Sequence, residues 1–296
     1  MIGRYAPSPT GTLHLGNLRT ALLAWLFARS ARSAFLMRIE DLDTGRVRPG
    51  LAEAQLADLA AIGLDWDPPV MTQSERLGAY QEAIARLDAD GALYPCFCTR
   101  REIREAASAP HGPLPEGAYP GTCRELTAAE RAELERAGRP PALRLRAGGE
   151  RAAFEDRVLG RVEAAVDDVV VRRNDGAPAY NLAVVVDDAA QGVEEVVRGA
   201  DLAETTARQI VLGRRLGLPA LAYAHVPLML GPDGSRLAKR HGAVTLADRP
   251  ESPARVRGML AASVGLADAG ETPSMRTLLD RFDPAKLPRE PTSVAA

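Results

Sequence analysis

The chain has 296 residues, of which 46% are hydrophobic and 26% are charged, and its formal net charge is −2. These values are ordinary for a globular protein with one large domain or two modest ones. No apolar run is long enough to cross a bilayer, and the N-terminus has no basic segment followed by an apolar stretch. We therefore expect a cytoplasmic protein without membrane insertion, in which any RNA contact depends on local basic patches rather than on overall charge.

The first ninety residues alternate between strand and helix signals. A short strand follows Met1, and apolar positions at helical spacing then predict an amphipathic helix over 15–28. The continuous apolar run 34–39 predicts a buried strand of the parallel type, and helices are predicted at roughly 50–62 and 74–89. This order predicts a doubly wound parallel α/β sheet, in which ligands bind at the carboxyl ends of the strands.

Residues 92–150 differ in composition, since they hold all three cysteines, several prolines and one predicted helix near 127–138. We interpret them as an insertion in an α/β domain formed by 1–91 and 151–245. A short helical segment, 246–296, completes the predicted organisation.

The second half of the chain gives weaker signals. Returning strands are predicted at 168–171 and 193–197, and 182–188 is ambiguous between strand and helix. A helix is predicted near 201–216, and the last dozen residues, rich in Pro, Ser and Ala, predict a loose tail.

The segment "RYAPSPTGTLHLGN" places a Pro/Gly hinge directly before the first long helix. Backbone N–H groups at a helix N-terminus attract phosphate, and glycines such as Gly11 and Gly16 let the backbone approach it closely. His14 and Asn17 are three residues apart, so both project from one face of the first turn and could donate to a phosphate or ribose. The alternative is a capped helix with a satisfied histidine.

A second segment, "GSRLAKRHG", packs the cations Arg236, Lys239 and Arg240 into a Gly/Ser loop, with His241 beside them. Alone, such a loop is usually a solvated basic loop. Together, the two segments offer what a triphosphate needs, namely a cradle and positive charge on the departing pyrophosphate.

These motifs resemble a known family. "PSPTGTLHLGN" resembles the HIGH signature of class I aminoacyl-tRNA synthetases, and "RLAKR" resembles their KMSKS loop. The strings "RYAPSPTGTLHLGNLRTAL", "RIEDLD", "YNLAVVVDD" and "VVRGADL" are similar to the glutamyl-tRNA synthetase branch, over roughly residues 2–245. The resemblance implies a Rossmann-type catalytic domain that activates glutamate with ATP, with Mg²⁺ on the phosphates.

Three positions depart from the signatures, and two of them keep the chemistry of the residue they replace. Asn17 stands at the second histidine of the first signature and keeps a hydrogen-bond donor. Arg236 stands at the first lysine of the loop and keeps its charge, while Ala238 replaces the serine. Lys239 retains the second lysine, so we expect an active enzyme.

The resemblance also implies roles for individual residues. The expected catalytic residues are His14, Asn17 and Lys239. The expected glutamate-binding residues are Arg4, Ala6, Ser8, Glu40, Tyr180 and Arg198. The expected ATP-binding residues are Pro7, Gly11, His14, Gly16, Asn17, Arg236, Leu237 and Lys239. Arginine suits carboxylate and glutamate suits ammonium, although outside this motif context Glu40 and Arg198 would be an ordinary surface ion pair.

Only 56 residues follow the KMSKS-like loop, too few for the helical anticodon-binding domain of a conventional glutamyl-tRNA synthetase. This length resembles the glutamyl-queuosine tRNA(Asp) synthetase family. That resemblance implies tRNA-independent glutamate activation and transfer to queuosine in the anticodon stem-loop of tRNA(Asp), by a monomer. The alternatives are a truncated conventional enzyme that charges tRNA(Glu), a catalytically weak RNA-binding regulator, and another adenylating ligase.

The cysteine spacing predicts a structural zinc site. Thiolates at Cys96 and Cys98 can clasp one Zn²⁺, and Cys123 can close a third corner of a tetrahedron. The family resemblance favours Tyr119 as fourth ligand, and His111 is the chemically more usual alternative. Three idle cysteines would be the plainer interpretation.

Two basic clusters are candidates for phosphate contacts with the anticodon loop. They are Arg100–Arg101–Arg104 and Arg208–Arg214–Arg215. Arginines on helices usually face solvent, which is the alternative.

Overall fold

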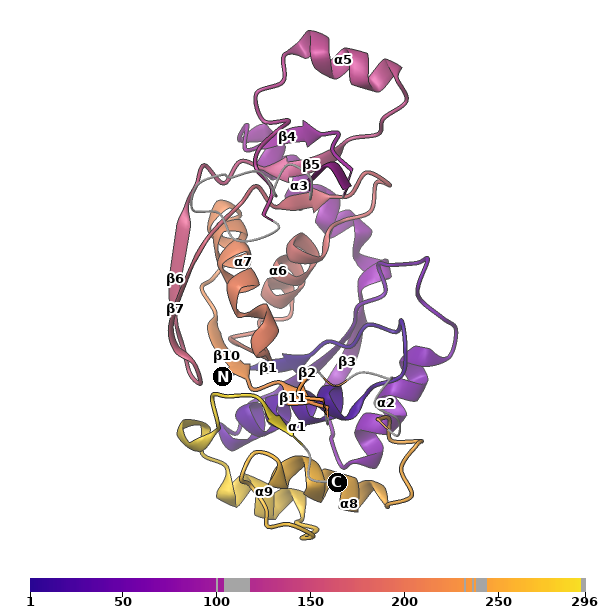
Figure 1. The fold of residues 1–296 in the computed structure, drawn as a ribbon, viewed down its shortest axis with the longest axis vertical. Helices are drawn as coiled ribbons and strands as arrows, with labels where there is room; N and C mark the ends of the chain where they lie inside the picture. The colour runs from indigo at the N-terminus through magenta and orange to yellow at the C-terminus, as the bar shows by residue number, and fades with distance from the viewer. Residues whose placement is uncertain (100, 104–117, 232, 236, 238–243, 294–296) are drawn as a thin grey trace.

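A seven-stranded sheet lies at the centre of the fold (Figure 1). The computed structural model describes residues 1–99, 101–103, 118–231, 233–235, 237 and 244–293. The order of the strands in the sheet is β3 (Asp67–Thr72), β2 (Phe35–Ile39), β1 (Gly3–Tyr5), β9 (Glu195–Gly199), β10 (Ala222–Val226), β6 (Arg151–Asp156) and β7 (Gly160–Ala165). All neighbours pair in parallel except the β6–β7 hairpin, which confirms the predicted mostly parallel sheet.

Helices cover both faces of this sheet. On one face lie α1 (Leu15–Ser30) and, further along, α2 (Leu51–Ala61) (Figure 1). On the other face lie α6 (Tyr180–Ala190) and α7 (Ala203–Arg215), with α3 (Leu77–Ala89) packed against α6. The ambiguous segment 182–188 is thus helical. Two short 3₁₀ turns, η1 (Gln73–Arg76) and η2 (Ala200–Leu202), precede α3 and α7.

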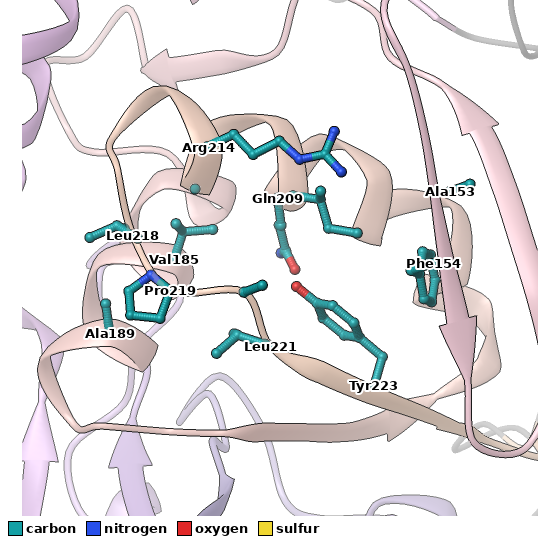
Figure 2. Close-up of a pocket in the computed structure, with 13 residues that line it drawn as sticks. Ala153, Phe154, Val185, Ala189, Gln209, Arg214, Leu218, Pro219, Leu221 and Tyr223 are labelled. Atoms are coloured by element: carbon teal, nitrogen blue, oxygen red, sulfur yellow. The ribbon is translucent and has the colours of Figure 1, made fainter.

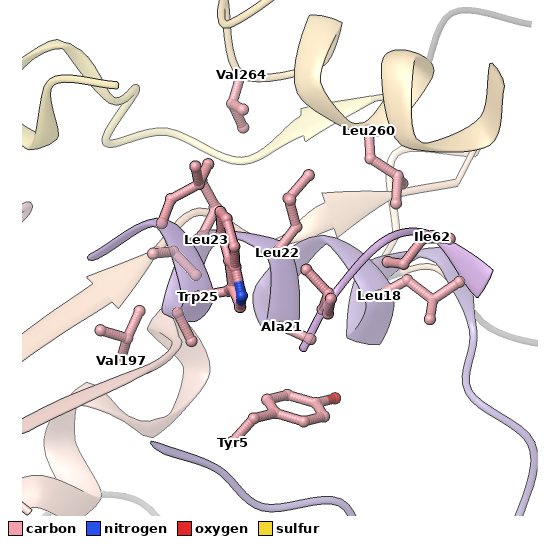
Figure 3. Close-up of a cluster of buried hydrophobic side chains, with 14 of the residues drawn as sticks. Tyr5, Leu18, Ala21, Leu22, Leu23, Trp25, Ile62, Val197, Leu260 and Val264 are labelled. Atoms are coloured by element: carbon pink, nitrogen blue, oxygen red, sulfur yellow. The ribbon is translucent and has the colours of Figure 1, made fainter. Parts of the chain in front are cut away.

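The first helix is more deeply buried than an amphipathic surface helix. Eleven of its side chains are buried, including Leu18, Leu22 and Trp25. Figure 3 shows Tyr5 packing from the sheet side and Leu260 and Val264 from the opposite side. The outer cover comes from α8 (Pro253–Ala262) and α9 (Met275–Arg281). The expectation of an amphipathic helix was therefore wrong, because helices from the C-terminal segment remove its second face from water.

A smaller three-stranded sheet carries the cysteine-rich segment. It consists of β4 (Leu93–Cys96), β5 (Ala142–Leu145) and β8 (Val170–Arg172), with α5 (Ala128–Arg136) beyond it (Figure 1). The strand predicted at 168–171 therefore pairs within this sheet and not within the large one. The domain boundaries at 91, 151 and 245 stay a prediction.

Contrary to the expectation of a loose tail, the C-terminal residues that the structure describes, up to Ser293, are attached to the fold. After η4 (Pro284–Lys286), β12 (Thr292–Ser293) pairs in parallel with β11 (Met229–Leu230). Buried Arg19 on α1 donates to the hydroxyl of Thr292 and, at 2.8 Å, to the carbonyl of Pro227. These contacts attach residues 292–293 to the strand that precedes the basic loop. Among the helices of the described ranges, none has the length and hydropathy needed to cross a membrane.

Candidate active site and metal centre

His14 and Asn17 cap the N-terminus of α1 reciprocally. The Nδ1 atom of His14 accepts from the Asn17 backbone N–H (3.2 Å), and Asn17 Oδ1 accepts from the His14 backbone N–H (3.1 Å). Because Nδ1 accepts, the neutral imidazole carries its proton on Nε2. A Cβ at Gly16 would lie 3.0 Å from the His14 ring, so the glycine leaves room for it. The capping alternative is thus realised, and it orients both side chains.

The segment that follows the KMSKS-like loop lies against this helix terminus. The Leu15 N–H donates to the Val244 carbonyl (2.7 Å), and His14 forms a β-bridge with Thr245. Within the loop, buried Leu237 donates its N–H to the Met229 carbonyl on β11 (2.9 Å). Predicted residues Arg236 and Lys239 lie outside the described residues, as do Ala238, Arg240 and His241.

The opening loop is fixed by contacts with its carbonyl groups. Gln55 on α2 donates its side-chain amide to the carbonyls of Ser8 (2.9 Å) and Gly11 (2.6 Å). The Glu40 N–H donates to the Pro7 carbonyl (2.9 Å), which joins this loop to the end of β2. Next to the loop lies a cavity of about 180 Å³, lined in part by Ala6, His14, Gly16, Asn17 and Arg198.

Arg4 and Glu40 belong to one buried charge network. Asp188 on α6 accepts from Arg4 Nε (3.1 Å) and from Arg38 Nη1 (2.6 Å), and Arg38 Nη2 donates to Glu40 (3.1 Å). Burial raises the pKa of Glu40, and the positive charges of Arg38 and Arg4 oppose this effect. The pKa of Asp188 is lowered although burial acts to raise it, since Arg4 and Arg38 stabilise the anion. These ion pairs fix the relative positions of the side chains of Arg4, Asp188, Arg38 and Glu40.

Arg198 ends β9 on the same side of the sheet. Its Nη1 atom lies 3.5 Å from the hydroxyl of Tyr180, and its other nitrogens donate to Thr206 and His225. Burial of the phenol raises the pKa of Tyr180 overall. The positive charges of Arg198 and Arg4 act to lower it, and the negative charges of Glu40 and Asp188 act to raise it. The structure therefore brings Arg4, Glu40, Tyr180 and Arg198 together.

A larger cavity of about 850 Å³ opens beside this group. Its lining includes Ser8, Glu40 and Tyr180 from the predicted amino-acid site, and Cys96 and Cys98 from the cysteine cluster. The two predicted sites therefore border a shared space.

The three cysteines come together with Tyr119. The sulfur atoms of Cys96, Cys98 and Cys123 lie within 4.8 Å of one another. The Tyr119 hydroxyl lies 3.4 Å from Cys96 Sγ and 3.9 Å from Cys98 Sγ, and it accepts from the Cys123 N–H at 2.7 Å. Hydrogen bonds with Cys123 and Cys98 lower the pKa of Cys96, and the pKa of Cys98 is raised. The three thiol groups could hold a metal ion, and the Tyr119 hydroxyl lies beside two of them. The alternative ligand His111 lies outside the described residues.

The basic clusters are only partly open to a phosphate. Arg208 pairs with Asp167 (2.6 Å) and Arg215 pairs with Glu150. Arg214 lines a separate cavity, which lies between β6 and the helices α6 and α7. Arg100 and Arg104 lie outside the described residues, so the role of these clusters in RNA binding stays a prediction.

Sequence analysis missed the residues that hold the predicted binding groups. Arg38 and Asp188 are fully or nearly fully buried, as are Asp156 and His225 on the other side of the site. A usable signal was the acid pair Asp187–Asp188 at the end of an apolar helical segment, because buried carboxylates need cationic partners.

The family model for the catalytic domain of class I tRNA synthetases (E and Q) matches residues 1–252. The chain belongs to this family. Among curated proteins, it is 63% identical to the glutamyl-Q tRNA(Asp) synthetase of Nocardia farcinica over 98% of this chain and 91% of that protein. It is 52% identical to the glutamyl-Q tRNA(Asp) synthetase of Symbiobacterium thermophilum over 100% of this chain and 96% of the relative.

Solved structures of the family have the same fold. The chain superposes on a glutamate tRNA ligase from Elizabethkingia meningosepticum, in complex with its amino acid, with a TM-score of 0.84 and 27% identity. The match covers all of this chain and 67% of that ligase. A glutamate-tRNA synthetase from Elizabethkingia anophelis gives a TM-score of 0.85 with 28% identity, covering 100% of this chain and 68% of the other.

Proposed function

We propose that the protein activates glutamate with ATP, without needing tRNA for this step, and transfers the glutamyl group to queuosine at the wobble position of tRNA(Asp). The observation that carries the proposal is the grouping of two guanidinium groups, Arg4 and Arg198, with the carboxylate of Glu40. This set is complementary to an amino acid with two carboxylates and one ammonium. Similarity to glutamyl-Q tRNA(Asp) synthetases along nearly the whole chain supports queuosine as the acceptor.

The activation step needs positioning and charge stabilisation more than covalent chemistry. An oxygen of the glutamate α-carboxylate attacks the α-phosphorus of ATP in line, the bond to the bridging oxygen breaks, and pyrophosphate leaves. His14, Asn17 and the backbone near Gly11 and Gly16 are suited to hold phosphate and ribose at the α1 terminus. Mg²⁺ bound with ATP would neutralise phosphate charge.

Lys239 and Arg236 are proposed to act on the departing pyrophosphate. The contacts of Val244 and Thr245 with α1 support this assignment, because they attach the end of the loop beside His14. Electrostatic stabilisation of a leaving group of this kind typically contributes about 3–4 kcal/mol to catalysis.

In the transfer step, a hydroxyl of the queuosine cyclopentene-diol attacks the carbonyl carbon of the glutamyl-adenylate. The new ester bond forms as the bond between the carbonyl carbon and the AMP phosphate oxygen breaks, AMP leaves, and the hydroxyl proton passes to solvent. We propose that the queuosine nucleotide of the tRNA(Asp) anticodon stem-loop enters the cavity of about 850 Å³, since that cavity reaches Glu40 and Tyr180.

We propose that Cys96, Cys98, Cys123 and Tyr119 bind one structural Zn²⁺. All four donors come from the protein, which leaves no position for a reacting water, and zinc would then stabilise the small sheet. Three cysteines that form a candidate metal cluster rather than a disulfide support a reducing compartment such as the cytoplasm. The monomeric state stays a prediction.

The test is exchange of labelled pyrophosphate into ATP with glutamate and without tRNA. We expect exchange with glutamate and none with aspartate or glutamine, and loss of exchange in Arg198→Ala. Arg276→Ala is the matched control, because this arginine is 83% exposed on α9 and remote from the site. Exchange that requires tRNA would instead indicate a conventional glutamyl-tRNA synthetase, and no exchange in any mixture would indicate a non-catalytic protein.

A further inference from the structure

The guanidinium group of Arg198 is held by residues that do not belong to the predicted binding set. Its Nε atom donates to His225 Nε2 at 3.2 Å, and its Nη2 atom donates to Thr206 Oγ1 at 2.6 Å. The parallel register pairs Arg198 on β9 directly with His225 on β10. The remaining nitrogen, Nη1, lies 3.5 Å from the hydroxyl of Tyr180, which is one of the predicted glutamate-binding residues.

These contacts define the tautomer of His225. Arginine has no acceptor, so His225 Nε2 must accept, and the proton of the neutral ring is on Nδ1. That proton is directed at Asp156 Oδ2, 2.6 Å away. Burial lowers the pKa of His225, which favours the neutral ring.

Asp156 is itself firmly fixed at the end of β6. Its carboxylate accepts from the backbone N–H groups of Val158 and Leu159, both at 2.9 Å, and from that of His225. Burial acts to raise the pKa of Asp156, but these bonds and the His225 ring lower it. The carboxylate therefore remains an anion that can orient the imidazole.

Two aromatic rings lie beside the imidazole ring. Tyr223 lies two residues away on the same face of β10, and its ring is nearly parallel to that of His225, at 13° and 6.2 Å between centroids. The Phe154 ring is 5.9 Å from His225. Figure 2 shows Phe154 and Tyr223 on one side of the neighbouring cavity of about 190 Å³. These rings enclose the imidazole, whereas its orientation is set by the hydrogen bonds with Arg198 and Asp156.

We propose that His225, oriented by Asp156, is a positioning residue that sets the guanidinium of Arg198 for a carboxylate of the substrate. The inference rests on the proposed function, since it takes Arg198 as a glutamate-binding residue. Thr206 is the second residue that fixes the guanidinium group. Arg198 is therefore held in one orientation, in which Nη1 is available to the substrate.

The test compares two variants, each of which keeps one of the two hydrogen-bonding functions of His225. His225→Asn retains a donor near the Nδ1 position for Asp156 but removes the acceptor for Arg198. His225→Gln presents an amide oxygen near the Nε2 position but loses the contact with Asp156. In glutamate-dependent pyrophosphate exchange, we expect His225→Asn to raise the KM for glutamate roughly 10–100-fold, the range for loss of a hydrogen bond to a charged group. The kcat and the KM for ATP should change by less than about threefold, and His225→Gln should recover part of the loss.

Phe154→Leu is the control for destabilisation, because it removes packing on the ring and leaves every hydrogen bond of Arg198. It should lower the melting temperature without raising the KM for glutamate. If His225→Asn does not fold, Thr206→Val tests the same idea, with Thr206→Ser as its rescue. The inference would be overturned if the KM for glutamate were unchanged in the folded His225 and Thr206 variants, or if Phe154→Leu raised it as much as His225→Asn does. Either result would leave the proposed function standing. A wild-type chain without glutamate-dependent exchange would overturn the proposed function and, with it, this inference.

Discussion

Asp188 accepts hydrogen bonds from Arg38 at 2.6 Å and from Arg4 at 3.1 Å, so one buried carboxylate orients two guanidinium groups. Arg38 also reaches Glu40 at 3.1 Å. A series of ion pairs, through Arg38 and Asp188, therefore connects the proposed ammonium-binding group, Glu40, with the proposed carboxylate-binding group, Arg4. Neither group can shift without disturbing the other.

Replacing Asp188 with Asn should affect both binding and stability. Breaking a buried ion pair by removing one partner costs about 3–5 kcal/mol of folding free energy, because the remaining charge is buried without compensation. We expect the KM for glutamate to rise in pyrophosphate exchange, together with a lower free energy of unfolding in urea.

Asp187→Asn is the matched control for this change. Asp187 is equally buried, but its short contacts are with Gln73 (2.8 Å), Arg76 (2.6 Å) and Tyr80 (2.8 Å), which attach η1 and α3 to α6. Its ion pair with Arg38 is longer, at 3.9 Å, and Arg4 pairs with Asp188 instead. It should lower stability with a smaller effect on the KM for glutamate. Equal KM effects in the two variants would contradict a positioning role for Asp188.

The lowered pKa of Asp188 predicts acid sensitivity. A carboxyl group whose pKa is lower in the folded than in the unfolded state adds stability above its unfolded value, about 3.9. This stability is lost as the pH falls through the folded pKa. Urea unfolding should therefore show a decline in the free energy of unfolding below about pH 4, and the decline should be shallower in Asp188→Asn. An identical pH profile in the variant would count against the assigned charge pair.

Metal binding at the cysteine cluster can be tested by elemental analysis of the purified protein. The wild-type chain should carry about one zinc ion, and Cys123→Ser should lose it, since one thiolate corner of the tetrahedron is removed. Tyr119→Phe should weaken zinc retention during dialysis against a chelator. Tyr94→Phe is the matched control, because the Tyr94 hydroxyl bonds to Asp168 at 2.5 Å rather than to the sulfur atoms. Equal retention in both tyrosine variants would favour another fourth ligand.

Gly16→Ala should separate activity from stability. The added Cβ would lie 3.0 Å from the His14 ring and displace it, which should lower kcat for activation by roughly 10²–10³-fold if His14 stabilises charge on the phosphates. Gly78→Ala on α3 meets nothing within 4 Å and should leave kcat unchanged. Its expected gain in helix stability is about 1 kcal/mol. Full activity in Gly16→Ala would remove His14 from the proposed mechanism.

Local patterns were sufficient to predict much of the fold. Apolar spacing predicted α1, β2 and α7 to within a few residues, and the signature segments predicted which residues gather at the carboxyl ends of β1 and β2. The strand β3 was missed because its sequence, "DPPVMT", contains two prolines, which an edge strand tolerates since one side needs no partner. The β6–β7 hairpin was missed because alanine and charged residues dominate it.

The supporting contacts of the site could not be predicted, because they join residues far apart in the sequence. Arg4 and Asp188 are separated by 184 positions, and Asp156 and His225 by 69. A single sequence shows that a buried acid needs a cation but not which cation it meets. The pairing depends on strand order and register, which tertiary packing decides.

The most direct test of the central claim is transfer of radiolabelled glutamate to purified tRNA(Asp) with and without queuosine, beside tRNA(Glu). The account predicts label on queuosine-containing tRNA(Asp) alone, and loss of that label in Arg198→Ala. Label on tRNA(Glu), or on tRNA(Asp) that lacks queuosine, would contradict it.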